Sequence, residues 1–182
     1  MNIDKQVTRF IERHIDLIEA NNFQLLYTIA AEQEDPFFPS NQLTRLFEEA
    51  GIDVLSHLQH IPPQFYWDDN EIRQFECPNH IQSIGSFAFD CCRNLHHVII
   101  NDGCELIDSR AFAGCDSLMY AVIPASVTHI ADDAFWDNKQ KHFSIVCDEG
   151  TTAYEYAEQH RIKWISTDTY NQHIKNSKGF VI

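Results

Sequence analysis

The sequence has 182 residues, of which 44% are hydrophobic and 12% aromatic, and it carries a formal net charge of −14. This length suits one compact domain or two small ones, and the apolar content excludes a disordered chain. A negative charge of this size disfavours direct binding of nucleic acid or anionic lipid. It is compatible with a basic protein partner or with solubility alone.

The first residues show no targeting or membrane segment. No apolar run long enough for a signal peptide follows Met1–Gln6, and polar residues interrupt the apolar stretch Ile15–Ile29. We therefore expect a cytoplasmic protein without a membrane contact. In that compartment the six cysteines should be reduced.

Helical periodicity dominates the first third of the chain. Residues 4–32 place apolar side chains at intervals of three and four, and Asn21-Asn22 is expected to divide them into two helices, because Asn favours caps and turns. A proline-containing loop then precedes a third helix that Ser40 or Asn41 can cap. Three apolar side chains of that helix are expected to face inward: Leu43, Leu46 and Phe47.

Two further signals end the helical part. Gly51 stands where the third helix should end, and Asp53 can cap a short fourth helix that runs through Leu58. The paired prolines that follow stop this helix. We therefore expect residues 1–63 to form an N-terminal helical cap domain.

Beyond the prolines the sequence changes to an internal repeat with a period of 23 residues. Three segments, residues 81–100, 104–123 and 127–145, align column by column, and a looser half-unit around Phe75 precedes them. A fixed period in so many columns indicates a solenoid of stacked units. The matching columns are Ile84, Ile107 and Ile130; Ala88, Ala111 and Ala134; Phe89, Phe112 and Phe135; Cys92 and Cys115; Leu95 and Leu118.

Each unit is expected to hold a short strand, a second extended piece and, between them, one helical or 3₁₀ turn that carries Ala-Phe. A single unit cannot bury its own apolar face, so stacking creates a continuous core of Ile on Ile and Phe on Phe. The third unit reads as one residue shorter, with Ile145 in the place of Ile123. The expected strands are Val98–Ile100, Ala121–Ile123 and Ser144–Val146.

The string I-x-x-I-G-x-x-A-F-x-x-C-x-x-L-x-x-V-x-I-P resembles the BspA-type leucine-rich repeat of bacteria and some protists, and the first unit matches it nearly throughout. The resemblance covers about residues 70–166 and includes a closing helix near Tyr154. It implies a curved solenoid that binds other macromolecules and has no catalytic residues. A helical segment followed by such repeats also looks like short repeat proteins of phages and their bacterial hosts. The later units depart from the string at Asp108, Ala121, Ala131, Asn138 and Lys141.

These observations predict the α+β class, as a short leucine-rich-repeat solenoid of about three 23-residue repeats, capped by an N-terminal helical bundle and a C-terminal helix. Residues 64–166 form the solenoid with its closing helix. Residues 167–182 form a C-terminal tail that can add a strand or stay disordered, because it is polar with an apolar end. An open edge of so short a solenoid also leaves room for a homodimer.

The sequence offers no constellation for catalysis, a metal or a cofactor. Cys92 and Cys115 share a repeat column, so we expect them to be buried and stacked. The ten histidines show no metal-ligand spacing and are expected to be solvated or to face a partner. No phosphate-binding loop, nucleophile elbow or H-E-x-x-H motif is present. An enzyme or metal protein is therefore the third of three hypotheses.

The first hypothesis is a protein-interaction module that binds its partner on the exposed face of the strands or on the adjoining turns. Trp136 occupies no core column and is the expected anchor. The run Phe65, Tyr66 and Trp67 is instead typical of core that caps the open end of a solenoid. The other candidate contacts in the repeats are Arg93, His96, His97, Asp116, Met119, Tyr120, Lys139 and His142.

The second hypothesis is an anti-defence inhibitor from a phage or mobile element, for example an anti-CRISPR-like protein, that blocks a basic nucleic-acid-binding protein. Residues 1–71 hold 13 of the 27 acidic residues but only 4 of the 13 basic ones. An acidic surface can mask a basic one, and such a complex weakens as salt rises. The acids expected to carry this mimicry are Glu32, Glu34, Asp35, Glu48, Glu49 and Asp53.

Overall fold

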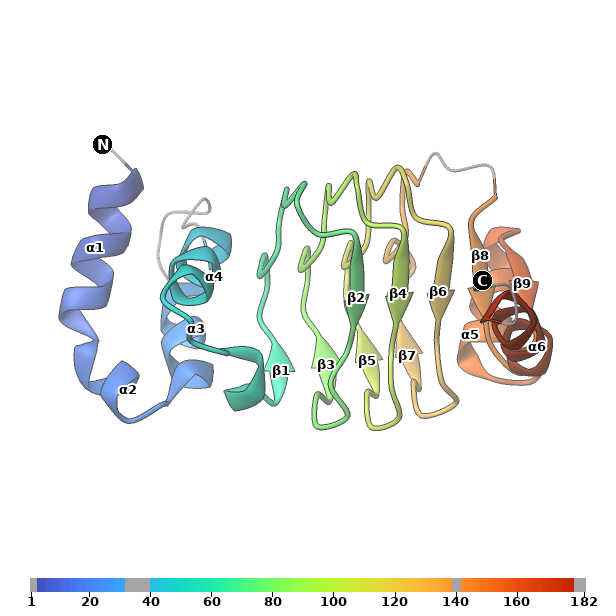
Figure 1. Ribbon diagram of the computed structural model, residues 1–182, viewed down its shortest axis with the longest axis horizontal. Coiled ribbons are helices and arrows are strands. Elements are labelled where there is room, and N and C mark those ends of the chain that lie inside the picture. The colour runs from blue at the N-terminus through green and yellow to red at the C-terminus, as the bar shows by residue number, and fades with distance from the viewer. Residues whose placement is uncertain (1–2, 32–39, 139–141, 179–182) are drawn as a thin grey trace.

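The computed structural model describes residues 3–31, 40–138 and 142–178. Helices at the N-terminal end lead into two layers of parallel strands, and helices also close the C-terminal end (Figure 1). The predicted α+β solenoid with helical ends is confirmed. Five residues of the sequence predictions lie outside the described ranges: Glu32, Glu34, Asp35, Lys139 and Lys141.

Asn21-Asn22 divides the first helical stretch, as the sequence predicts. Asn21 has a left-handed φ of 54°, and the side chain of Asn22 accepts a hydrogen bond from the backbone N–H of Leu25 at 3.3 Å. Asn tolerates this conformation and caps helices, so this pair sets the break. The helices on either side are α1 (Ile3–Arg13), α2 (Ile15–Glu19) and α3 (Phe23–Ala31).

The next helix, α4 (Ser40–Glu49), packs against α3, where the hydroxyl groups of Tyr27 and Thr44 lie 2.7 Å apart. Gly51 follows it with a φ of 74°, as expected for a helix end. The prediction that Leu46 faces inward is wrong, because this side chain is 43% exposed. Buried positions recur at intervals of three and four, which leaves Leu46 on the flank of the helix. The buried residues of α4 are Ser40, Leu43, Thr44 and Phe47.

A short 3₁₀ helix, η1 (Leu55–His57), stands in the place of the expected fourth helix. Its N-cap residue is Val54 and not Asp53, although the Asp53 carboxylate accepts a hydrogen bond from the backbone N–H of Ser56 at 3.3 Å. The chain then enters its first strand at His60. The solenoid therefore begins inside the stretch that the sequence assigns to the helical cap.

Two parallel sheets form the layers of the solenoid (Figure 1). Paired residues in the first turns are 23 positions apart, as in Phe75 with Val98 and Ile84 with Ile107, which confirms the repeat. The short sheet has the order β1 (His60–Ile61), β3 (Ser83–Ile84), β5 (Leu106–Ile107), β7 (His129–Ile130). The longer sheet has the order β2 (Gln74–Glu76), β4 (His97–Ile99), β6 (Tyr120–Val122), β8 (Ser144–Val146), β9 (Lys163–Ile165).

The register of the third repeat differs from the sequence alignment. Ala121 pairs with Ile145, and the backbone N–H of Ile123 donates to the oxygen of Val146 at 2.9 Å. Cys147 therefore occupies, in the third unit, the column position that Ile123 occupies in the second. This unit is one residue longer than the 23-residue period, not one residue shorter. The shift is of two residues and keeps Ile145 on the core side, where Ile145 and Cys147 are both fully buried, so the apolar pattern fits either alignment.

Stacked side chains fill the space between the two sheets. The rings of Phe89 and Phe112 lie 5.0 Å apart and those of Phe112 and Phe135 lie 5.3 Å apart, each pair 15° from parallel. Cys92 and Cys115 are fully buried in a neighbouring column, as predicted. The Ala-Phe segments form turns and not the single helical or 3₁₀ turn that the sequence predicts. The core is therefore continuous from turn to turn, as a stack of units requires.

One column of the repeat has a left-handed backbone in all four turns. Asp68, Cys91, Gly114 and Asp137 have φ values of 54°, 65°, 62° and 56°. Only glycine takes this conformation without a clash at Cβ. Aspartate tolerates it better than most residues, so Cys91 is the position of this column with the most backbone strain.

A closing helix follows the last repeat. This helix, α5 (Thr152–His160), begins after Thr151, whose hydroxyl accepts a hydrogen bond from the backbone N–H of Tyr154 at 3.3 Å. Strand β9 then returns to the edge of the longer sheet and pairs with β8. Together they end the stack, as the sequence predicts for this helix.

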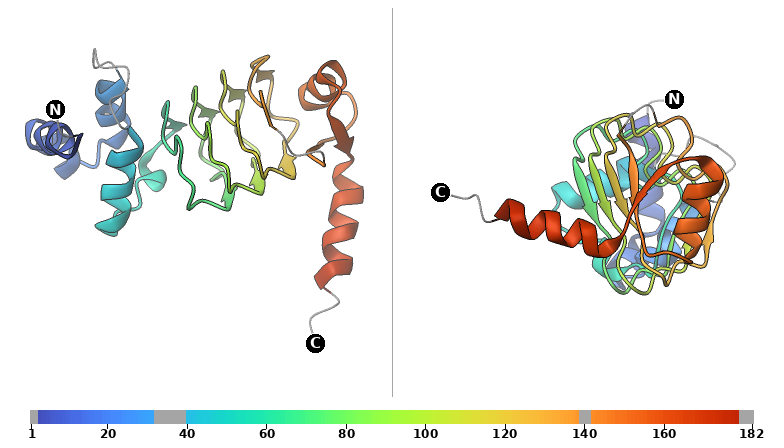
Figure 2. Two further views of the ribbon diagram at one scale, coloured as in Figure 1. Left: turned by 90° about the horizontal axis from the view of Figure 1, so that it is seen from above. Right: turned by 90° about the vertical axis from the view of Figure 1, so that its right-hand side faces the viewer.

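The tail forms a helix, α6 (Thr167–Lys178), where the sequence analysis expected an added strand or disorder. Ser166 explains the helix start, because its hydroxyl accepts a hydrogen bond from the backbone N–H of Thr169 at 3.3 Å. Figure 2 shows that α6 projects away from the solenoid. Its first turn is therefore the part that meets the longer sheet.

Candidate functional site

The outer face of the longer sheet carries apolar side chains. Strands β4 and β6 alternate across the pleat, so their central residues enter the core and the flanking ones face outward. The outward residues of a sheet with one solvated face are usually polar. Here four of them are half-buried aromatic or aliphatic side chains: His97, Ile99, Tyr120 and Val122.

Aromatic rings connect this face to α6. The rings of His97 and Tyr120 stack 5.9 Å apart and 13° from parallel, and the ring of Tyr170 lies 5.8 Å from that of Tyr120. On β8 the outward residues Ser144 and Val146 are buried. The face is therefore closed over β8 and remains partly exposed over β2, β4 and β6.

Partial burial also determines the charge of these rings. Burial, and secondarily the neighbouring His96, lowers the pKa of His97 below its ordinary value of 6.5. Burial, and secondarily Tyr120, raises the pKa of Tyr170 above its ordinary value of 10.0. Both rings are therefore uncharged near neutral pH, and the stack presents an aromatic surface.

The predicted contact residues fall into two groups around this sheet. His97 and Tyr120 lie on the outer face itself, and the ring of His96 lies 6.4 Å from that of His97. The others stand at the amino ends of the strands or in the turns before them, so they form a rim rather than the face. These rim residues are Arg93, His96, Asp116, Met119 and His142.

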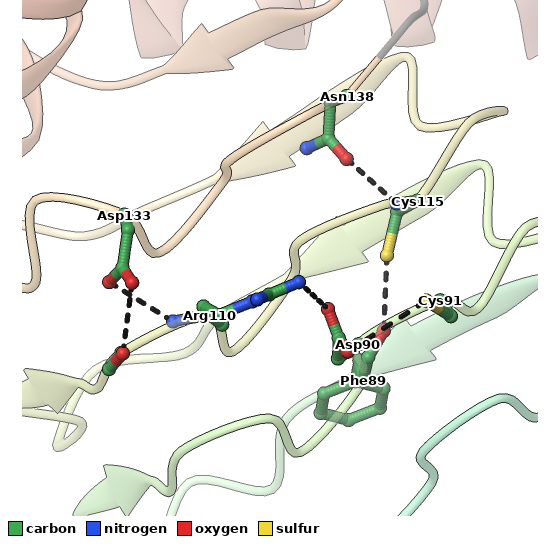
Figure 3. Close-up of polar contacts among 8 residues, drawn as sticks. Phe89, Asp90, Cys91, Arg110, Cys115, Asp133 and Asn138 are labelled. Carbon is green, nitrogen blue, oxygen red and sulfur yellow. Dashed lines mark hydrogen bonds and ion pairs between the residues drawn. The ribbon is translucent and has the colours of Figure 1, made fainter.

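Trp136 lies in a separate cluster on a turn. Its side chain is 56% exposed, and the Arg110 guanidinium lies 4.9 Å from the centre of its ring and 5.4 Å from that of Phe87. Arg110 also forms a 3.5 Å ion pair with the buried Asp90, and its backbone N–H donates to Asp133 at 3.3 Å (Figure 3). The cluster therefore holds an exposed tryptophan in a fixed position.

Glu48 and Glu49 belong to the cap and not to the sheet. The carboxylate of Glu48 accepts a hydrogen bond from the hydroxyl of Tyr66 at 2.9 Å. Burial raises the pKa of Tyr66, and Glu48 raises it further. Phe65 and Tyr66 are buried beneath the cap, which agrees with the predicted core that closes the solenoid's open end. Glu48 and Glu49 are both exposed, and Glu48 supports this junction through its bond to Tyr66.

The cysteines are free thiols, and five of them are buried. Burial raises the pKa of Cys77 to about 12 and that of Cys104 and Cys147 to about 11. The thiolate is the form that attacks substrates and binds metals, so these groups are poor nucleophiles and poor ligands. Within the described ranges no three His, Cys, Asp or Glu side chains gather closely enough to hold a metal ion.

A polar cavity of about 620 Å³ opens between η1 and the loops at one edge of the solenoid. His57, Gln82 and Glu105 line it, and His80 on its wall lies 3.0 Å, through Nε2, from the carbonyl oxygen of Leu55. Ligand pockets are usually enclosed and mostly apolar, with a few convergent polar groups. This open, polar space lacks that character and supports no specific chemistry.

The sequence did not predict three residues of this face: Ile99, Val122 and Tyr170. Ile99 and Val122 follow core residues directly, and a strict period of two through each strand would have placed them outward. Tyr170 required the recognition of α6, whose polar sequence gives a weak helical pattern. Arg110 was hidden for another reason, because nothing in the sequence places its side chain between two aromatic rings.

Comparisons with known proteins agree with this geometry. The family described as the BspA type leucine rich repeat region matches residues 49–174, in six copies. The matched range begins at the end of α4 and extends into α6. No curated protein and no solved structure matches the chain significantly. Over the described part of the chain, no helix combines the length and apolar character that crossing a membrane requires.

Proposed function

Because the chain belongs to the BspA-type leucine-rich repeat family, we propose that it is a non-catalytic protein-interaction module whose partner binds the outer face of the longer sheet. Stacked repeats of this kind generally offer extended surfaces for protein–protein contact. One observation carries the choice of face: uncharged aromatic and aliphatic side chains point outward from β4 and β6. They are His97, Ile99, Tyr120 and Val122.

The stack of His97 on Tyr120 favours tight binding, because its rings are already positioned in the free protein. A partner then loses little side-chain entropy when it covers them. Tyrosines at the centre of an interface often contribute about 2 kcal/mol, which is about 30-fold in Kd. The rim residues Arg93, His96, Asp116, Met119 and His142 would surround this centre, and Trp136 would add a second contact.

Affinity capture from the native host with two paired variants tests this proposal. His97→Ala combined with Tyr120→Ala should abolish capture of the partner, while the protein keeps its circular dichroism spectrum. The matched control combines Leu106→Ala with His129→Ala, which removes outward side chains from the shorter sheet. Equal capture by both double variants would contradict a role for the longer sheet.

The acidic surface favours a second candidate function, the blocking of a basic nucleic-acid-binding protein in an anti-defence role. The net charge of −14 and the exposed Glu49 support it. Complex formation with such a protein should weaken steeply as salt is raised, and Glu49→Gln should reduce it. A complex that is insensitive to salt would argue against charge mimicry and would leave the interaction module as the function.

A further inference from the structure

The longer sheet ends at β2, and one side of this strand faces no further strand. In a parallel sheet, alternate residues of a strand direct their backbone N–H and C=O groups to opposite neighbours. The N–H of Cys77 donates to the oxygen of Ile99 at 2.8 Å, so Cys77 and, two residues earlier, Phe75 direct these groups to β4. Gln74 and Glu76 therefore direct theirs to the open side.

The open side of β2 is unpaired. Over the residues that the structure describes, β2 pairs with β4 alone, and no backbone hydrogen bond reaches Gln74 or Glu76 from the other side. Both residues are exposed, whereas Phe75 between them is buried. Their N–H and C=O groups are therefore left to water, and such a row of groups is a template for another strand.

The N-terminal helices cover the first strand of the other layer instead. The side chain of Gln24 on α3 accepts hydrogen bonds from the backbone N–H groups of Gln59 and His60, both at 3.0 Å, where β1 begins. The side chain of Asn41 on α4 donates to the carbonyl oxygen of Trp67 at 2.8 Å, in the turn after β1. These contacts close the start of β1 and the turn that follows, and none of them reaches β2.

The core beside β2 is also slightly open. Phe75 is 6% exposed and Tyr66 is 8% exposed, whereas the equivalent residues of the next turn, Val98 and Phe89, are fully buried. Each strand of this sheet places its central side chain on that of the strand before, as Val98 lies on Phe75. An apolar side chain at the centre of an added strand would therefore complete this column.

We propose that β2 binds an extended segment of a partner protein, which adds to the longer sheet as a further strand. Its backbone would pair with Gln74 and Glu76, and an apolar side chain at its centre would turn inward beside Phe75. The backbone selects this occupant, because the exposed side chains along the strand have mixed charge: Glu71, Arg73 and Glu76. The site is separate from the outer face of the sheet, so the inference goes beyond the proposed function and does not rest on it.

A second copy of the chain is a poorer occupant than an extended segment. The other edge strand of this sheet is β9, so a second copy would add head to tail, with its β9 beside β2. Figure 1 shows that the N-terminal helices extend beyond β2 at one end and that α5 and α6 lie beside β9 at the other. These helices would meet before the two strands came within about 4.8 Å, the spacing that pairing requires. An extended segment carries no such bulk.

A phage-displayed library of random peptides of about seven residues, selected on the full chain, tests the inference. Selected peptides are resynthesised in two forms that carry N-methyl groups on alternate residues. One form loses the N–H groups that face β2 and should bind about tenfold more weakly for each hydrogen bond lost. The other form keeps them and should bind like the parent peptide. Because both forms keep all side chains, each is the matched control of the other.

Substitutions at Gln74 test the same contact from the side of the protein. Gln74→Pro removes a backbone N–H that takes no part in the pairing with β4, and proline is tolerated at such an edge position. It should weaken binding of the parent peptide by about tenfold. Gln74→Ala keeps the N–H, is the matched control, and should bind like the wild type. Circular dichroism and urea titration check folding, and if Gln74→Pro does not fold, the two methylated peptides decide alone.

Several results would overturn the inference: a selection without binders, equal binding by the two methylated forms, or a folded Gln74→Pro that binds like Gln74→Ala. Self-association that Gln74→Pro abolishes would assign this strand to a second copy instead. The double variant His97→Ala with Tyr120→Ala should bind the peptides normally, and a loss of their binding would place them on the outer face. Failure of that variant to lose its host partner would contradict the proposed function and leave the strand β2 site standing.

Discussion

Substitutions at Cys91 and Gly114, two positions of the column with a left-handed backbone, should change the free energy of unfolding in opposite directions. Cys91 and Gly114 are equivalent positions with φ values of 65° and 62°. A side chain costs about 1–2 kcal/mol in this conformation, and the greater freedom of glycine in the unfolded chain offsets about 0.5–1 kcal/mol. Cys91→Gly should therefore raise the free energy of unfolding by about 0.5–1 kcal/mol. Gly114→Ala should lower it by about 1 kcal/mol, because alanine takes on the same strain.

Urea titration followed by circular dichroism measures both changes, and heating should show shifts of about 2–4 °C per kcal/mol at this chain length. Cys91→Ala is the matched control, because it removes the sulfur and keeps both Cβ and the strain. Ala125→Gly, at an exposed position outside this column, should only destabilise. If Cys91→Gly is no more stable than Cys91→Ala, the column imposes no strain and the reasoning fails.

Four more predictions follow from the contacts described. Phe112→Ala should lower the free energy of unfolding in urea by about 3–5 kcal/mol, because this ring is fully buried between two stacked neighbours; a loss below 1 kcal/mol would contradict a tightly packed core. Trp136→Ala should lower it by about 0.5–1 kcal/mol through the lost contact with Arg110, and no change would mean that this contact stabilises nothing. The free energy of unfolding should fall as the pH drops below 6.5, because the pKa of His97 is lowered in the folded state and the unfolded chain takes up the proton first. His97→Gln should flatten this pH dependence in a series of urea titrations. An unchanged slope would assign the pH dependence to other groups. Cys91 should be the first cysteine to react with a thiol reagent, since it is half-buried, and the other five should react only on unfolding. If the Cys91→Ala variant still shows a rapid phase of thiol labelling, this order is wrong.

The repeat determined most of the fold that could be predicted from the sequence. Equivalent residues such as Phe89 and Phe112 occur every 23 positions because each must stack on the one before. This constraint therefore appears in the sequence itself as a fixed period. The register of Ile145 was missed because Ile145 and Cys147 are both buried on the same side of the pleat, so the apolar pattern alone does not choose which of them lies opposite Ile123. Tyr170 was missed because its helix is stabilised by a local cap at Ser166 and by contact with Tyr120, not by a strong apolar pattern.

The candidate site was only partly predictable for a related reason. His97 and Tyr120 differ from the core columns, so the alignment exposes them as surface residues. Ile99 and Val122 have the same residue types as the core, and their outward direction depends on strand bounds that the alignment set one residue later. Apolar residues on an outer face therefore look like core until the pleat is known.

Net charge alone gives an incomplete description of the surface that would meet a partner. A total of −14 averages over the whole surface, yet near the amino ends of the longer sheet exposed Arg73 and Arg93 lie close to exposed Glu71, while Glu76 stands at a carboxyl end. Salt at physiological strength screens charges over about 8 Å, which is close to the length of these short strands. A distant partner therefore responds to the total charge, whereas a bound one responds to the individual side chains that it contacts. The total should then govern the rate of association with basic proteins, while the outward Ile99 and Val122 and the side chains around them govern which element binds and how long it stays.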